Sequence, residues 1–131
     1  MNELYYGANT FFSNVRSSGL AAALENFQKT GVIVKSLAND QYDNNRLDDD
    51  LGVGSALPLV IPDLDKAWIN VVNADRNDYQ SGGPRYTRKS EPCKESARFC
   101  ISADGHGHDL LKGNSTTGLH KGATGTSFAG P

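Results

Sequence analysis

The chain lacks the features that would place it in a membrane or on an anionic partner. It has no run of about 18 apolar residues, so no segment is expected to span a bilayer. Its N-terminus, Met-Asn-Glu-Leu-Tyr, has neither the basic region nor the apolar run of a signal peptide. A net charge of -2 gives no electrostatic reason to expect nucleic acid as a partner. We therefore expect a domain without a membrane span and without a nucleic-acid partner.

Cysteine is also scarce, since Cys93 and Cys100 are the only two. Two cysteines are too few for a zinc site built from cysteine alone. They stand close enough in the sequence to form a disulfide if their Cβ atoms face one another, and they can equally be two separate thiols. A disulfide would indicate an oxidising compartment.

The composition does not favour a helical bundle. The 131 residues include 14 glycines together with many Asn, Asp and Ser, which is typical of a loop-rich domain. A hydrophobic content of 37% is enough for one modest core.

One stretch predicts a helix followed directly by a strand. Apolar residues at helical spacing begin at Leu20 and end at Phe27, and we expect Gly31 to close the helix as a left-handed cap. The β-branched run 32–34 predicts a strand buried in a parallel sheet. Asn39 then lies beyond the carboxyl end of this strand, where ligands bind in open α/β sheets.

Further strands are expected downstream. Residues 68–72 predict a second core strand, and Tyr86-Thr87 and residues 99–101 predict two further extended segments. Residues 104–126 are rich in Gly, Asp, Ser and Thr, which suits a long active-site loop.

The C-terminal residues present one serine between small residues, where the chain can pass into a helix. The segment reads Gly125-Thr126-Ser127-Phe128-Ala129-Gly130-Pro131. Free N–H groups at a helix N-terminus favour the oxyanion that forms when serine attacks a carbonyl. The α/β-hydrolase elbow does not fit, because it needs glycine where this chain has Ala129.

Three segments together resemble subtilisin-like serine proteases (subtilases, peptidase family S8). Ser127 falls on the family's nucleophile, residues 32–40 resemble its strand ending in the oxyanion-hole asparagine, at Asn39, and residues 68–75 resemble its next core strand. Cys93 through Gly105 look like the cysteine pair of autotransporter-type members. The resemblance covers roughly residues 20–131 and implies that 1–131 is the C-terminal part of the catalytic domain. It implies a partial three-layer α/β fold with a mostly parallel sheet, loop-rich and truncated at both ends.

The resemblance implies a serine endopeptidase that acts on protein or peptide substrates. Ser127 would be the nucleophile, and Asn39 would donate to the oxyanion. No cofactor is implied, and calcium has no motif to support it. A secreted or cell-surface location is implied, with a C-terminal translocator domain in the full-length protein.

The chain also departs from the family's pattern. The family's histidine precedes its asparagine, whereas all three histidines here follow Asn39, so no residue is assigned as triad histidine or triad aspartate. We therefore expect a fragment that is inactive alone. Ala38 replaces the glycine before the asparagine, Lys35 occupies a normally apolar strand position, and Asp104 replaces a turn proline.

Other functions stay open at this point. The chain can be a pseudoprotease or binding remnant that keeps its sheet without catalysis. His106 and His108 can instead serve a metal-dependent hydrolase, although exposed loop histidines are the simpler interpretation. His120 is close to Ser127 in sequence, but a dyad would not match the family's order. Asp43 and residues 48–50 lack the spacing of an EF-hand, which favours a solvated acidic loop over calcium.

Overall fold

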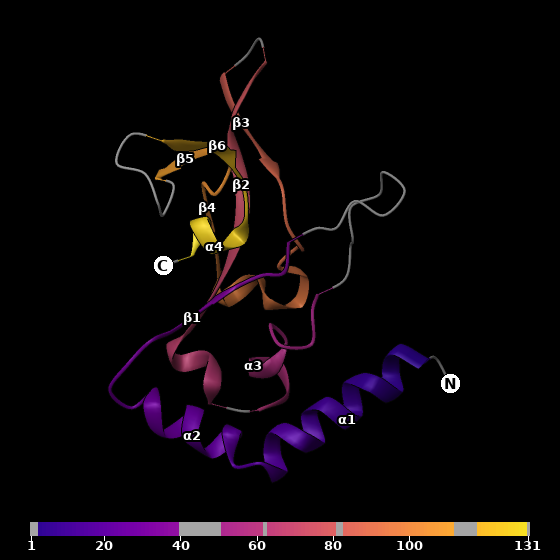
Figure 1. Ribbon diagram of the computed structural model, residues 1–131. Coiled ribbons are helices and arrows are strands. Elements are labelled where there is room, and N and C mark those ends of the chain that lie inside the picture. Colours follow the sequence, from indigo (N-terminus) through magenta and orange to yellow (C-terminus); the bar gives the residue numbers. More distant parts are fainter. Residues whose placement is uncertain (1–2, 40–50, 62, 81–82, 112–117, 131) are drawn as a thin grey trace.

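The structure is a computed structural model that describes residues 3–39, 51–61, 63–80, 83–111 and 118–130. Its helical elements are α1 (Glu3–Ser17), α2 (Leu20–Phe27), α3 (Leu57–Val60), η1 (Leu64–Ala67), η2 (Lys94–Phe99) and α4 (Thr126–Ala129). Its strands are β1 (Ile33–Ser36), β2 (Trp68–Gln80), β3 (Gly83–Arg88), β4 (Cys100–Ala103), β5 (His108–Leu111) and β6 (Leu119–Ala123). The expected α/β class with a mostly parallel sheet is confirmed (Figure 1).

β2 is the centre of a four-stranded sheet. Its first half pairs in parallel with β1, where Ile33 is opposite Trp68, and with β4, where Asn70 is opposite Cys100. Its second half pairs antiparallel with β3. Because the carboxyl ends of parallel strands meet at one edge, Asn39 and the residues after β4 come together there.

The hydrophobic core lies where the helices meet the first half of the sheet. Its buried members come from α1, α2, α3, η1, β2 and η2: Val15, Ala21, Leu57, Ile61, Leu64, Trp68 and Phe99. In Figure 1, α1, α2 and α3 lie together below the sheet, and α4 lies higher, alongside the sheet.

α1 has no counterpart among the elements expected from the sequence. Phe11, Phe12 and Val15 follow helical spacing, and these three side chains pack into or against the core. Gly19 connects α1 to α2 with a φ of 79°, a left-handed conformation that favours glycine. The helix expected from Leu20 is present as α2.

Two details of the expected helix and strand are wrong. Gly31 follows α2 but does not adopt a positive φ, and a Cβ there would instead lie 2.6 Å from the Phe27 ring. β1 is parallel as expected, but Val32 and Val34 are 55% and 39% exposed. Both lie on the face of the strand opposite Ile33, and of these three residues Ile33 is the one that packs against the core.

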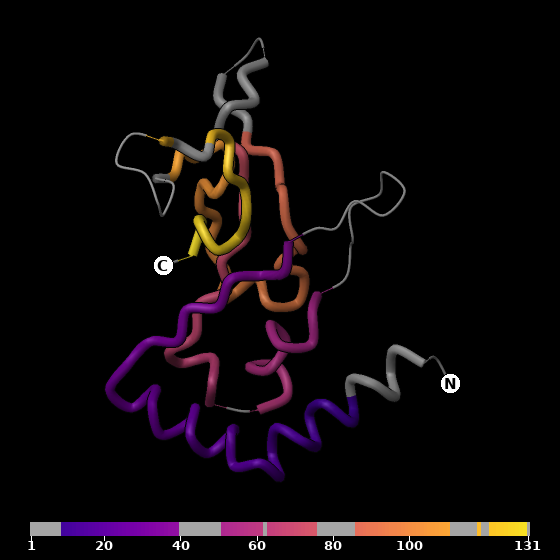
Figure 2. The backbone as a smooth tube through the Cα atoms, viewed as in Figure 1, coloured from indigo at the N-terminus to yellow at the C-terminus, as the bar shows by residue number. Residues whose placement is uncertain are grey.

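The segment expected to be a long loop contains regular structure. β5 and β6 form an antiparallel pair, with His108 opposite Ala123, and a single turn of helix, α4, follows. Figure 2 shows this C-terminal segment, in yellow, returning to lie over the sheet. α4 contacts β2 and β1, which brings the end of the chain to the strand that Asn39 follows.

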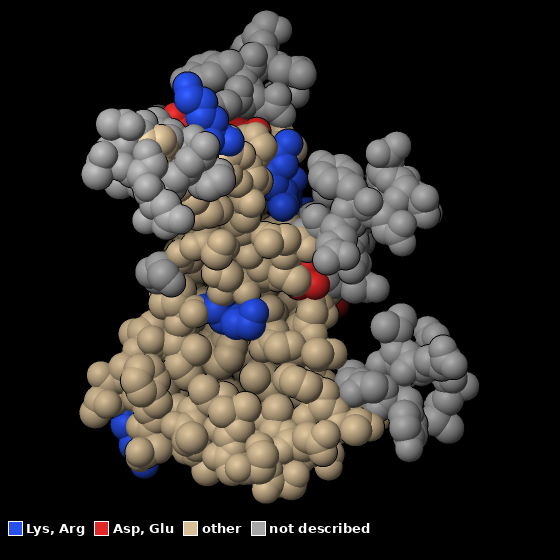
Figure 3. All heavy atoms as spheres, in the orientation of Figure 1, with Lys and Arg blue, Asp and Glu red and all other residues tan. Residues whose placement is uncertain are grey.

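Among the described residues on the face that Figure 3 draws, charged side chains do not gather in a large patch. The described basic side chains on this face are separated by uncharged surface. Among the described residues, no helix combines the length and the apolar character needed to cross a bilayer.

Candidate active site

Asn39 and α4 are joined directly, although they are far apart in sequence. The Asn39 Oδ1 atom accepts a hydrogen bond from the Thr126 N–H at 2.7 Å and another from the Thr126 hydroxyl at 3.1 Å. The backbone of Asn39 also forms an isolated antiparallel bridge with Ser90. The side chain therefore ties the end of β1 to the turn that begins α4.

Ser127 and Asn39 border one small space above Gly125. A Cβ on buried Gly125 would lie 3.4 Å from Ser127 Oγ, 3.5 Å from Asn39 Oδ1 and 3.7 Å from Asn39 Nδ2. Ser127 itself is exposed. Because Oδ1 is occupied by Thr126, the Nδ2 amide remains as a donor, and it has no acceptor among the described residues. A hydroxyl and an amide donor thus face the same space.

Asn73 supports this arrangement from beneath and was not expected as a site residue. Its side chain is fully buried, its Oδ1 accepts from the Gly105 N–H at 2.9 Å, and its Nδ2 donates to the Gly105 carbonyl at 3.3 Å. That carbonyl also accepts from the Gly125 N–H at 2.9 Å. The chain of contacts runs from β2 through Gly105 to the residue before α4. A second asparagine within the first half of β2 was the available signal in the sequence.

Gly105 is required by close packing. A Cβ on it would lie 2.5 Å from the Gly125 carbonyl oxygen and 2.9 Å from the Ala129 backbone nitrogen. Both neighbours are backbone atoms that cannot rotate away, so a larger residue would displace α4.

Glu91 binds backbone N–H groups on both sides of the segment that follows Asn39, at Ala38 and at Gly52. One carboxylate oxygen, Oε2, accepts from the Ala38 N–H at 3.3 Å and from the Gly52 N–H at 3.2 Å. The Glu91 N–H donates back to the Ala38 carbonyl at 3.0 Å. Ala38 is thus held through its backbone while its own surface is exposed.

Lys35 and Asp104 also have local partners. The ammonium of Lys35 donates to the Ser36 carbonyl at 2.6 Å. The carboxylate of Asp104 accepts from the His106 N–H at 3.1 Å, which stabilises the turn after β4.

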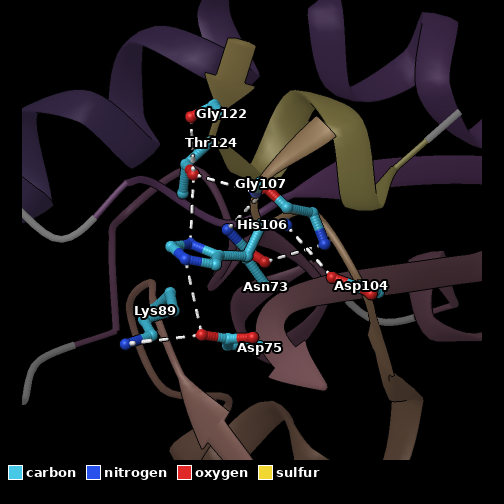
Figure 4. Close-up of polar contacts among 9 residues, drawn as sticks. Asn73, Asp75, Lys89, Asp104, His106, Gly107, Gly122 and Thr124 are labelled. Atoms are coloured by element: carbon cyan, nitrogen blue, oxygen red, sulfur yellow. Dashed lines mark hydrogen bonds and ion pairs between the residues drawn. The ribbon is translucent and has the colours of Figure 1, made fainter. Parts of the chain in front are cut away.

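The described histidines do not meet Ser127. His106 contacts Thr124 and Asp75 (Figure 4). The His108 Nε2 atom lies 3.1 Å from the Asp104 carbonyl oxygen, and its ring centroid is 6.0 Å from that of Phe128. Within the described ranges, the Ser127 hydroxyl has no hydrogen-bond partner. The side chain of His120 lies outside the described residues.

The metal hypothesis receives no support from the described part of the chain. It contains no group of three or more His, Cys, Asp or Glu side chains placed to hold an ion. Asp43 and residues 48–50, considered for calcium, lie outside the described residues.

Cys93 and Cys100 are joined in a disulfide, with Cα atoms 6.1 Å apart. The bridge spans η2 and fixes the start of β4. Within the same loop, the buried Ser96 hydroxyl donates to the Cys93 carbonyl at 2.6 Å and accepts from the Asn70 amide at 2.9 Å. The disulfide therefore secures the connection from Glu91 to the central sheet.

Two surface hollows lie away from these residues. One of about 560 Å³ lies between α1 and the end of α3, and one of about 390 Å³ lies between α2 and η1. At the second, the Asp63 carboxylate raises the pKa of Lys66 by accepting a hydrogen bond from its ammonium. Neither of these two hollows includes Asn39 or Ser127.

Comparisons of the chain with protein-family models, with curated proteins and with solved structures found no match.

Proposed function

We propose that the chain is the C-terminal part of a subtilisin-like serine endopeptidase domain in which Ser127 is the nucleophile. The observation that carries this proposal is that the Ser127 hydroxyl and the Asn39 amide border the same space over Gly125. The order of motifs along the sequence and the parallel pairing of β1, β2 and β4 are consistent with it.

The proposed reaction uses two groups of this chain at one carbonyl. Ser127 Oγ attacks the carbonyl carbon of the scissile peptide bond, and the tetrahedral oxyanion accepts hydrogen bonds from Asn39 Nδ2 and the Ser127 N–H. The hydroxyl proton needs a base, which the resemblance places upstream of Asn39 and assigns to no residue of this chain. Without that base Ser127 is a weak nucleophile, and the chain alone is expected to hydrolyse peptides negligibly.

A fluorophosphonate tests the proposal on the chain as it exists, because the reagent is far more electrophilic than a peptide. Added imidazole supplies the missing base. We expect imidazole to accelerate phosphonylation, peptide mapping to locate the adduct on Ser127, and Ser127→Ala to abolish it. Ser102→Ala, which removes an exposed hydroxyl on β4, is the matched control and should leave labelling unchanged. An adduct distributed over several serines, or one that persists in Ser127→Ala, would refute the assignment.

Asn39→Asp tests the Nδ2 donor of Asn39 separately from the hydrogen bonds that its Oδ1 atom accepts from Thr126. Aspartate keeps an oxygen that can accept from Thr126, but it replaces the Nδ2 donor by a carboxylate oxygen that repels an oxyanion. Removing such a donor in subtilisin costs about 10²–10³ in turnover, a magnitude that belongs to that enzyme and was not worked out from this chain. We expect a labelling loss in the same direction, with the fold retained. Unchanged labelling would remove Asn39 from the proposed role.

The absence of a described histidine beside Ser127 favours a second candidate, a binding remnant that keeps the sheet without catalysis. In that case imidazole would not accelerate labelling of Ser127 above that of other exposed serines.

A further inference from the structure

We propose that Asp75, His106 and Thr124 form a polar relay that positions the turn carrying Ser127. The relay rests on the proposed function of Ser127 and adds three positioning residues to it. None of the three was expected to act at Ser127 from the sequence, where His106 was considered as a metal ligand or an exposed loop histidine.

The relay is a continuous series of side-chain contacts. The His106 Nδ1 atom lies 3.0 Å from Thr124 Oγ1, and the His106 Nε2 atom lies 3.4 Å from Asp75 Oδ2. The Lys89 ammonium lies 3.9 Å from the same carboxylate oxygen. Figure 4 shows the imidazole between Thr124 and Asp75, with Lys89 beside the same carboxylate oxygen.

The contacts place the two nitrogens of the imidazole against different partners. Nε2 faces the Asp75 carboxylate and Nδ1 faces the Thr124 hydroxyl, which also lies 3.4 Å from the Gly122 carbonyl oxygen as a donor. The same hydroxyl oxygen accepts from the Gly107 N–H at 3.2 Å. Thr124 therefore both donates and accepts, and a valine of the same shape can do neither.

The relay acts on Ser127 through the backbone. Thr124 directly precedes Gly125, and His106 directly follows Gly105. Because the Gly125 N–H donates to the Gly105 carbonyl at 2.9 Å, the side-chain contact and this backbone bond close one small ring. Asp75 anchors the ring to β2, where its side chain is only 12% exposed. The ring fixes the residue over which Ser127 and Asn39 meet.

The relay is a support and not a second nucleophile site. His106 faces Thr124 and Asp75, and it makes no contact with Ser127 among those that the described residues form. Thr124 is already bound by the imidazole and by Gly107.

Thr124→Val and Thr124→Ser form a matched pair that tests the relay. Valine keeps the branched shape at an exposed position and removes the hydroxyl, whereas serine keeps the hydroxyl. For Thr124→Val we expect amide hydrogen exchange at Gly125 to accelerate about two- to tenfold, the effect of losing one net hydrogen bond. The maximal rate of Ser127 phosphonylation with imidazole should fall by a similar factor, with the half-saturating reagent concentration unchanged. Thr124→Ser should restore both.

A double-mutant cycle with His106→Ala completes the test. If the two residues act as one unit, the double variant should match the single variants and should not multiply their effects. The relay would be overturned if the Gly125 amide of Thr124→Val exchanged at the wild-type rate. It would also be overturned if the effects of the two substitutions multiplied in the double variant. Amide exchange is measured without the fluorophosphonate, so it tests the relay even if Ser127 is never labelled. A failure to label Ser127 would instead refute the proposed function.

Discussion

Truncating Asn73 should destabilise the protein and loosen the candidate site together. In Asn73→Ala the buried Gly105 N–H loses its acceptor, which costs about 1–3 kcal/mol. The Gly105 carbonyl still accepts a hydrogen bond from the Gly125 N–H, so it is not left unpaired. The lost amide volume adds about 1 kcal/mol through the cavity that remains. We therefore expect the free energy of unfolding to fall by about 2–4 kcal/mol.

Asn70→Ala is the matched control, because Asn70 is equally buried on the same strand but serves another part of the molecule. Its amide accepts from the Trp68 indole at 2.8 Å and donates to the Ser55 carbonyl and to Ser96. Urea unfolding should show a comparable loss in both variants. Amide exchange at Gly125, relative to that of the Val71 amide in β2, should accelerate only in Asn73→Ala. A stability loss under about 0.5 kcal/mol, or equal acceleration in both variants, would refute the reasoning.

Two further predictions concern packing and the disulfide. Gly105→Ala places a Cβ against the backbone of Gly125 and Ala129, so it should lower stability by about 1–3 kcal/mol and abolish Ser127 labelling. Gly107→Ala is the control, because a Cβ there would have no neighbour within 4 Å. It should lower stability by only about 1 kcal/mol, because Gly107 has a positive φ, and it should retain Ser127 labelling. Equal labelling in the two variants would contradict the account. Replacing Cys93 and Cys100 together by serine should lower the free energy of unfolding by about 2.5 kcal/mol, measured with urea. Reductant should then have no further effect on that variant, and a wild type insensitive to reductant would argue against the bridge.

Patterns of neighbouring residues in the sequence correctly predicted one helix and parts of two strands. The apolar spacing from Leu20 predicted α2, and the β-branched and aromatic residues at 68–72 and 86–87 predicted parts of β2 and β3. The predicted burial of β1 was wrong, because residue types at 32–34 indicate a strand but not which of its faces is covered. α1 was missed, although Phe11, Phe12 and Val15 carry a helical pattern.

Less of the candidate site could be predicted from the sequence. The proximity of Asn39 and Ser127 was expected only through the resemblance, since no local pattern connects residues so far apart. Asn73 and the relay of Asp75, His106 and Thr124 depend on contacts between β2, the turn after β4 and the turn before α4. Such contacts follow from the parallel arrangement of the strands, which the spacing of polar residues does not reveal.

The most direct test of the central claim is the ¹⁵N-resolved proton spectrum of the Asn39 side-chain amide before and after phosphonylation of Ser127. The account predicts that one Nδ2 proton moves downfield as it donates to the phosphonyl oxygen, and that its exchange with solvent slows. Side-chain amide resonances of Asn39 that do not change on formation of a Ser127 adduct would contradict the claim that the two groups share one site.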